Sequence, residues 1–153
     1  DVGNHVKPVM DELFKLCAHT SWTDYIVLWK SWPPEGDEQT VMFGTHDLEL
    51  REDVSEADFD WFVGREFASA WRNEIAGCGR IVLKGDRGAN AGKYRIIYSF
   101  RPHTLRDRYL PTPTTQSAEF REKVRPLFPN EVTEKFQSMA KSVGYSDWGP
   151  VLR

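Results

Sequence analysis

Hydrophobic positions along this chain switch between helical and strand-like spacing, and these switches predict a series of elements. Residues 5–17 carry apolar side chains three or four positions apart, which predicts a helix with one apolar face. The stretch "SWTDYIVLWKSW" is rich in β-branched and aromatic residues and predicts a strand. "PPEGDE" predicts a turn, and "QTVMFG" a second strand paired with the first as a hairpin. The alternation in "HDLELREDV" is compatible with an extension of the sheet.

The clearest helix signal lies in residues 55–75. Ser55 followed three residues later by Asp58 resembles a capping box, with Asp in place of Glu. Gly77 stands where a helix would end. The predicted buried stripe consists of Phe59, Phe62, Val63, Phe67, Ala70, Trp71 and Ile75.

The glycine-rich stretch "GDRGANAGKYRIIYSF", residues 85–100, raises the question of a phosphate-binding loop. A P-loop requires G-x-x-x-x-G-K-[ST] opening a helix, whereas Gly92 and Lys93 are followed here by Tyr94. The residues after Lys93 alternate with period two, which predicts a strand rather than a helix. Together with the preceding strand "RIVLK", the stretch therefore predicts a β-hairpin that binds no nucleotide.

The last third of the chain predicts an irregular connector, two short helices and a tail. Residues 102–116 are rich in proline and threonine and predict the connector. "SAEFREKVR" predicts a helix that stops before Pro126. "NEVTEKFQSMAKSVG" predicts another that ends at Gly144 and has its stripe at Val132, Phe136, Met139, Ala140 and Val143. Residues 145–153 form the tail. We expect one α+β domain over residues 1–153, with an antiparallel sheet of about four strands packed by the N-terminal and long central helices.

Composition narrows the class of protein. With 153 residues, 40% hydrophobic and 28% charged, the chain has the size and composition of one globular domain. No apolar run approaches the roughly 18 residues that span a bilayer, and charge interrupts the N-terminal segment where a signal peptide would be apolar. Two cysteines make no disulfide framework, so we expect a cytoplasmic protein without membrane contact. Four scattered histidines match no metal or catalytic motif, and we expect neither metal nor cofactor.

The net charge of −3 conceals an asymmetry between two parts of the chain. Residues 31–66 contain 11 acidic side chains against Arg51 and Arg65. Residues 80–125 contain 11 basic side chains against four acidic ones. Such polarity steers charged partners, unless the two segments interleave in space and their fields cancel.

The basic segment 80–125 supports one functional hypothesis. Its arginines and lysines are interspersed with Tyr94, Tyr98, Phe100 and Tyr109, a combination typical of surfaces that bind nucleic acids. Against this, the alternation from Lys93 to Arg101 places aromatic and basic side chains on opposite faces of the strand. A nucleic-acid-binding or regulatory module is therefore the alternative hypothesis, and an enzyme without a visible motif is a third.

The order of elements, with certain residues, resembles the YezG-like immunity proteins of bacterial polymorphic toxins. The resemblance covers roughly residues 5–101 and is carried by "WTDYIVLW", "DFDWFVGREFASAWRNEI" and "GKYRIIYSF". After the last strand the sequence departs from the family, because this chain is basic there and the family tends to be acidic. It implies a cytoplasmic protein without enzymatic activity that binds a toxin domain, commonly a nuclease, and blocks it. An acidic surface suits such a basic groove, because electrostatic attraction speeds association. We expect the contact at Glu35, Asp37, Glu38, Asp47, Glu49, Glu52 and Asp53.

Overall fold

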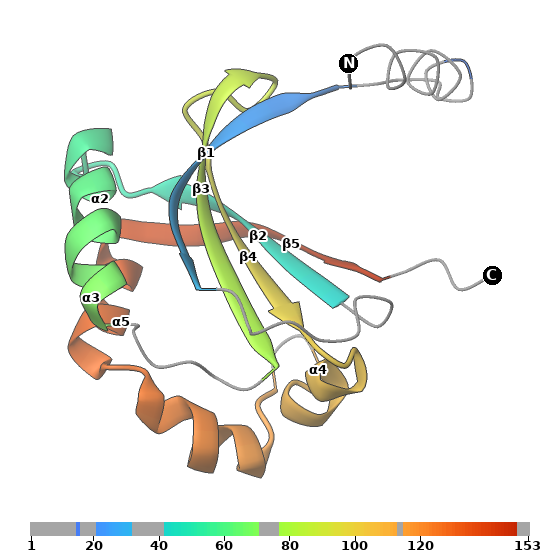
Figure 1. The fold of residues 1–153 in the computed structure, drawn as a ribbon. Helices are drawn as coiled ribbons and strands as arrows, with labels where there is room; N and C mark the ends of the chain where they lie inside the picture. The colour runs from blue at the N-terminus through green and yellow to red at the C-terminus, as the bar shows by residue number, and fades with distance from the viewer. Residues whose placement is uncertain (1–14, 16–20, 32–41, 71–76, 113–114, 150–153) are drawn as a thin grey trace.

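A computed structural model describes residue 15 and residues 21–31, 42–70, 77–112 and 115–149 of the chain. Its core is one antiparallel sheet (Figure 1). The strands are β1 (Thr23–Ser31), β2 (Met42–Leu50), β3 (Cys78–Gly88), β4 (Tyr94–Phe100) and β5 (Ala140–Trp148), in the spatial order β1-β3-β4-β2-β5. The expected α+β class is thereby confirmed.

Helices cover one face of this sheet (Figure 1). Three segments follow one another without a break: α2 (Glu56–Phe62), a π-helical segment (Val63–Phe67) and α3 (Ala68–Ala70). We call residues 56–70 the central helix. After α4 (Thr104–Tyr109) come a π-helical segment (Phe120–Val124), a 3-10 turn (Arg125–Leu127) and α5 (Asn130–Met139). No helix in the described part of the chain is long and apolar enough to cross a membrane.

The predicted stripe of the central helix packs onto the sheet. Phe59 and Val63 are fully buried, and the ring of Phe136 on α5 lies 5.7 Å from that of Phe59. The predicted cap is present, because the Ser55 hydroxyl accepts a hydrogen bond from the Asp58 amide. The core cluster consists of Leu48, Phe59, Phe62, Val63, Phe67, Val82, Tyr94, Ile96 and Ala140. Trp71, Ile75 and the turn "PPEGDE" lie outside the described residues, as does the helix expected at 5–17 apart from residue 15.

The hairpin predicted for residues 85–100 is confirmed. Strands β3 and β4 pair antiparallel from Cys78 opposite Phe100 to Lys84 opposite Tyr94. Gly88 and Gly92 adopt positive φ angles of 96° and 75° in the connection. Tyr94 and Ile96 belong to the core, as the period-two pattern predicts.

The predicted hairpin between the first two strands is wrong. β1 pairs with β3 at one edge of the sheet, whereas β2 lies between β4 and β5. Strands adjacent in sequence usually pair, but packing determines the neighbour here. Trp29 of β1 lies edge-on to Phe67 of the central helix, with ring centroids 5.1 Å apart, so β1 packs against this helix as well as pairing with β3.

The sheet has five strands rather than about four, because the predicted helix 130–144 ends early. α5 stops at Met139, and Ala140 begins β5, which includes residues 145–148 of the expected tail. Val143 is 57% exposed instead of belonging to a helical stripe. Pairing with β5 satisfies the backbone groups on the side of β2 that faces away from β4, and this pairing outweighs the helical pattern. The expected connector 102–116 contains α4, and the turn at Arg125–Leu127 runs through Pro126.

Candidate functional site

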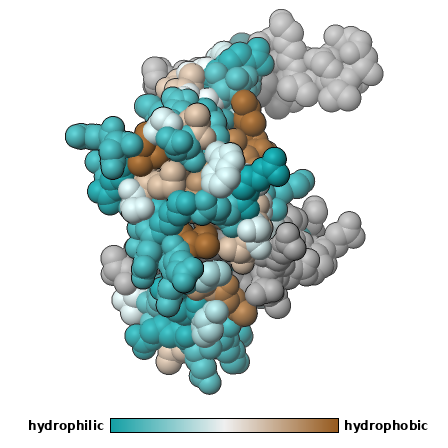
Figure 2. Space-filling model, turned by 90° about the vertical axis from the view of Figure 1, so that its left-hand side faces the viewer, coloured by the Kyte–Doolittle hydropathy of each residue, from teal (hydrophilic) through white to brown (hydrophobic). Residues whose placement is uncertain are grey.

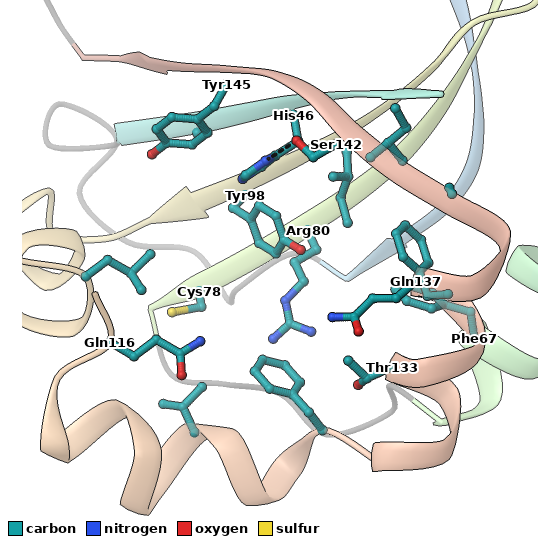
Figure 3. Close-up of a pocket in the computed structure, with 18 of the residues that line it drawn as sticks. His46, Phe67, Cys78, Arg80, Tyr98, Gln116, Thr133, Gln137, Ser142 and Tyr145 are labelled. Carbon is teal, nitrogen blue, oxygen red and sulfur yellow. Dashed lines mark hydrogen bonds between the residues drawn. The ribbon is translucent and has the colours of Figure 1, made fainter. Parts of the chain in front are cut away.

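A cavity of about 800 Å³ lies between the helix-covered face of the sheet and the C-terminal helices. The inward residues of β2, β3, β4 and β5 form its floor, and α5 and residues 120–128 form the opposite wall (Figure 3). The side of the molecule that bears the helices is mostly hydrophilic, with hydrophobic residues showing near its middle (Figure 2). Most of the cavity lining is apolar, and a few polar groups lie within it.

Arg80 lies at the centre of this cavity, on strand β3 (Figure 3). Only 6% of its surface is exposed. Its guanidinium carbon lies 4.5 Å from the centroid of the Phe128 ring and 5.9 Å from that of Tyr98. Burial lowers the pKa of Arg80 to about 10, which still leaves the side chain charged at neutral pH.

His46 and Ser142 form a second polar group at the end of the cavity where β2 meets β5. His46 Nδ1 and Ser142 Oγ lie 3.0 Å apart, within hydrogen-bond distance. The imidazole packs between Tyr98 and Tyr145, with ring centroids 5.7 and 4.6 Å away. Burial lowers the pKa of His46, and the nearby carboxylates of Asp147 and Asp47 only partly oppose this. The ring is therefore neutral at pH 7.

Four cationic side chains stand among the described residues that line the cavity. They are Arg51, Arg80, Arg125 and Lys141, and the described lining includes no Asp or Glu. The Arg51 guanidinium donates to the backbone carbonyl of Gln137 at 3.4 Å, which ties the end of β2 to α5. Lys141 also pairs with Glu49, at 2.8 Å.

Uncharged polar side chains reach into the same space (Figure 3). The amide of Gln116 lies near Cys78 on one side, and the amide of Gln137 points toward Arg80 from α5. Thr133 is placed one turn before Gln137 on the same helix. Burial raises the pKa of the Cys78 thiol to about 11, so the thiol stays protonated at neutral pH and is a poor nucleophile.

The acidic residues predicted as a partner surface fall into three groups. Asp47 and Glu49 lie two positions apart on β2, and each is in an ion pair, Asp47 with Arg95 at 2.6 Å. Glu52 and Asp53 are exposed in the turn after β2. Glu35, Asp37 and Glu38 lie outside the described residues.

Several basic side chains of segment 80–125 are also in ion pairs. Lys84 contacts Asp60, and Arg106 of α4 contacts Asp147 of β5. Arg108 pairs with Glu119 at 2.9 Å. Strand order explains the pair of Arg95 with Asp47, because β4 lies next to β2 and these two residues stand opposite each other. Within the described residues, the acidic and basic parts of the sequence interleave.

Sequence reasoning missed the cavity as a site. One signal was available in "CGRIVLK", because Cys78, Arg80 and Val82 alternate toward the core and the middle residue is charged. A charged residue at an inward strand position is rare unless it is paired or functional. The other members come from β2, α5 and residues 116–128, and no local pattern links them.

No family model matches the chain, and neither a curated protein nor a solved structure does.

Proposed function

We propose that this protein acts by binding a small organic molecule in the cavity beneath the C-terminal helices. The observation that carries the proposal is a cavity of about 800 Å³ with an apolar lining and a few convergent polar groups. Binding sites for small molecules typically have roughly 300–1,000 Å³ and this composition. The site would hold such a ligand with most of its surface removed from water.

The protonation state of Cys78 argues against a thiol nucleophile, because burial raises its pKa and the thiol stays protonated. His46 is neutral and lies within hydrogen-bond distance of the Ser142 hydroxyl, an arrangement in which the imidazole can accept the hydroxyl proton. The amides of Gln116 and Gln137 can donate hydrogen bonds to a ligand and orient it.

Two fluorescent dyes with the same ring system test this proposal. N-phenyl-1-naphthylamine is neutral, and 8-anilinonaphthalene-1-sulfonate carries a sulfonate; both brighten in apolar sites. We expect saturable 1:1 binding of at least one dye to the folded protein. Thr133→Trp should abolish it by filling the cavity, whereas Ser138→Trp, on an exposed position of the same helix, should not. Absence of saturable binding, or binding that survives Thr133→Trp, would contradict the proposal.

Neutralisation of a bacterial toxin is a second proposal, which comes from the resemblance to YezG-like immunity proteins. The feature that favours it is the turn containing Glu52 and Asp53, where both side chains are exposed and ion-paired to no described residue. Electrostatic contacts of this kind mainly raise the association rate. Asp47 and Glu49 are weaker candidates for contact with a toxin, because each is already in an ion pair within the protein.

Co-purification with a candidate toxin domain tests this second role. The double variant Glu52→Lys, Asp53→Lys should fold normally, since exposed charges contribute little to stability. It should slow association with the toxin and reduce the salt dependence of the rate. Filter binding with DNA and RNA tests the alternative use of the basic segment. Submicromolar binding at about 150 mM salt that is lost with Lys93→Gln and Arg121→Gln would favour nucleic acid over a toxin.

A further inference from the structure

We infer that the cavity is also a catalytic site for the hydrolysis of carboxylic esters with an apolar body, in which Ser142 is the nucleophile and His46 the general base. This inference rests on the proposed function, because the body of the ester must occupy the cavity. It adds a reaction and a substrate class to the binding of a small molecule. Water is the second substrate.

Strand pairing brings the two residues together. His46 of β2 and Ser142 of β5 both line the cavity and meet at one end of it (Figure 3). The register of these strands shifts by one residue between positions 47 and 48. Because of this shift, Tyr145 rather than Gly144 stands opposite His46. Such bulges are common next to active sites, where they change the direction of a side chain.

The imidazole is placed to accept the serine proton. Ser142 Oγ lies 3.0 Å from His46 Nδ1 and 3.4 Å from the carbonyl oxygen of Gly144, so the ring is the closer acceptor. Tyr98 and Tyr145 hold the ring between them, with ring centroids 5.7 and 4.6 Å away. Burial lowers the pKa of His46, so the ring is neutral at pH 7 and, with its proton on Nε2, presents a lone pair at Nδ1. A serine hydroxyl becomes an effective nucleophile when a neighbouring base takes its proton in this way.

The surroundings of the ring also favour the imidazolium ion that this proton transfer forms. The carboxylates of Asp147 and Asp47 raise the pKa of His46, although burial outweighs them. Their negative charge therefore stabilises the ring once it carries a second proton. Arg106 binds Asp147 and Arg95 binds Asp47, which fixes both carboxylates in place and weakens their field at the ring.

The reaction proceeds through an acyl-serine. Ser142 Oγ attacks the carbonyl carbon of the ester, forms a new C–O bond and gives its proton to His46 Nδ1. The C–O bond to the alcohol then breaks, and the alcohol leaves with the proton from Nδ1. A water molecule next attacks the acyl group and gives a proton to Nδ1. The serine oxygen leaves with that proton, and a carboxylic acid is released.

The apolar lining determines the body of the substrate. Ile96, Phe120, Val124 and Phe136 line the cavity beyond the reactive pair. An aliphatic or aromatic acyl chain gains from burial against these walls, in proportion to the apolar area that it removes from water. The ester group itself is uncharged, so it enters such a cavity at a lower cost than an ion would.

Phenylmethylsulfonyl fluoride tests the nucleophile, because a serine displaces its fluoride and its benzyl group matches the apolar walls. We expect one equivalent to label the wild-type protein, on Ser142 as located by peptide mass mapping. Ser142→Ala should abolish the labelling, whereas Ser146→Ala, at another exposed serine of β5, should not. His46→Gln should slow it about 100-fold or more, because glutamine can accept the hydrogen bond but not the proton.

Two p-nitrophenyl esters, the acetate and the hexanoate, test turnover. The hexanoate should have a kcat/KM at least about tenfold higher, because its longer chain buries more apolar surface. Thr133→Trp should remove this preference by filling the cavity. Ser142→Ala should lower kcat/KM about 100-fold or more and leave dye binding and the near-ultraviolet circular dichroism unchanged.

The pH profile reports on the base. Only neutral His46 can take the serine proton, so kcat/KM should be constant near pH 7. It should fall as the pH drops through the lowered pKa of His46, which lies below the usual value of about 6.5. If His46→Gln does not fold, this profile of the wild type decides the role of His46.

Each outcome decides. Labelling and turnover that depend on both Ser142 and His46 support the inference. Hydrolysis that survives Ser142→Ala, or labelling of other residues alone, overturns it. Labelling that a folded His46→Gln variant leaves unchanged shows a purely structural hydrogen bond and also overturns it.

The dye titrations separate this result from the proposed function. Saturable dye binding without Ser142-dependent hydrolysis overturns the inference and leaves the proposed function intact. If neither dye saturates, the proposed function fails. Ser142-dependent hydrolysis that Thr133→Trp does not change would then place the reaction outside the cavity and overturn the inference as well.

Discussion

Lys84 Nζ on β3 lies 2.7 Å from the Asp60 carboxylate on α2, and this ion pair joins the sheet to the central helix. Tyr94 on β4 donates its hydroxyl to the other oxygen of Asp60, also at 2.7 Å. Glu56, one turn earlier, contacts Lys84 at 2.9 Å. One carboxylate thus connects two strands to the first turns of the helix, beside the buried ring of Phe59.

Replacing Asp60 should destabilise the protein by more than a surface charge would. Asp60→Asn removes the ion pair with Lys84 and weakens the bond from Tyr94, at a cost of about 1–3 kcal/mol for charge-assisted hydrogen bonds. Asp53→Asn, an exposed position in the turn before α2, is the matched control and should cost under about 0.5 kcal/mol. Urea denaturation of the three proteins measures both values. Equal stability of the two variants would contradict the anchoring role of Asp60.

The same contacts predict a loss of stability in alkaline solution. The hydrogen bond to Asp60 raises the pKa of Lys84, and burial followed by Asp60 raises that of Tyr94. In the unfolded chain both groups lose their protons near pH 10. The folded protein holds these protons more tightly, so this stabilisation is complete below about pH 10 and is lost as the pH rises through the raised values. Urea denaturation at about pH 8 and at about pH 11 measures the effect. The free energy of unfolding should fall less between these two pH values in Asp60→Asn than in the wild type.

Two aromatic residues on the same helix should differ sharply in their effect on stability. Phe59 is fully buried and lies edge-on to Tyr94, with ring centroids 4.8 Å apart, whereas Trp61 is 59% exposed. Phe59→Ala should cost about 3–5 kcal/mol through the lost burial and the cavity it leaves. Trp61→Ala should cost less than about 1 kcal/mol. Thermal denaturation measures both losses. A loss of stability for Trp61→Ala as large as that for Phe59→Ala would contradict this expectation.

Local sequence patterns predicted the parts of this fold that depend on one face being buried. The central helix shows its stripe because Phe59, Phe62 and Phe67 must point at the sheet. The period-two pattern after Lys93 is clear because β4 is a central strand with Tyr94 and Ile96 in the core. In both cases burial on one side imposes a period on the sequence.

Elements at the margin of the sheet carry no such signal. β5 lies at the edge, and most of its residues are exposed, so its apolar residues have no strand-like alternation. The stripe of α5 continues by chance through Ala140 to Val143, and it therefore suggested a longer helix. Strand pairing is also invisible locally, because it depends on contacts such as Trp29 with Phe67. The cavity depends on that pairing, which brings His46, Arg80 and Ser142 to one face.

Gly64 offers a simple way to stabilise the protein. It is exposed within the central helix, and a Cβ atom added there would meet nothing within 4 Å. Gly64→Ala should raise stability by about 0.5–1 kcal/mol, because alanine restricts the unfolded chain. Gly88→Ala is the contrasting variant, since Gly88 has a φ of 96° and a Cβ would collide with the backbone of Trp22. Gly88→Ala should lower stability. Chemical denaturation measures both variants, and a Gly88→Ala protein more stable than Gly64→Ala would contradict the prediction.

The glycine-rich connection between β3 and β4 should bind no nucleotide. Its backbone leads from one strand directly to another, without the helix N-terminus that phosphate groups require. Titration calorimetry with ATP and GTP at millimolar concentration should give no saturable heat. If heat of binding is seen, the variant Lys93→Ala, at an exposed position, tests whether the binding depends on this connection. Saturable binding that this variant abolishes would refute the expectation.

The position of β5 has a consequence for the biosynthesis of the protein. The strand that completes the sheet beside β2 is made about a hundred residues later, since Trp148 bonds to Thr45 across 103 positions. While the ribosome makes the intervening chain, β2 presents one open edge of unpaired backbone groups, a recognised route to aggregation. Closure also requires contacts of long sequence separation, which slow folding. The cavity with its His46–Ser142 end is therefore assembled last, once nearly all of the described chain has been synthesised.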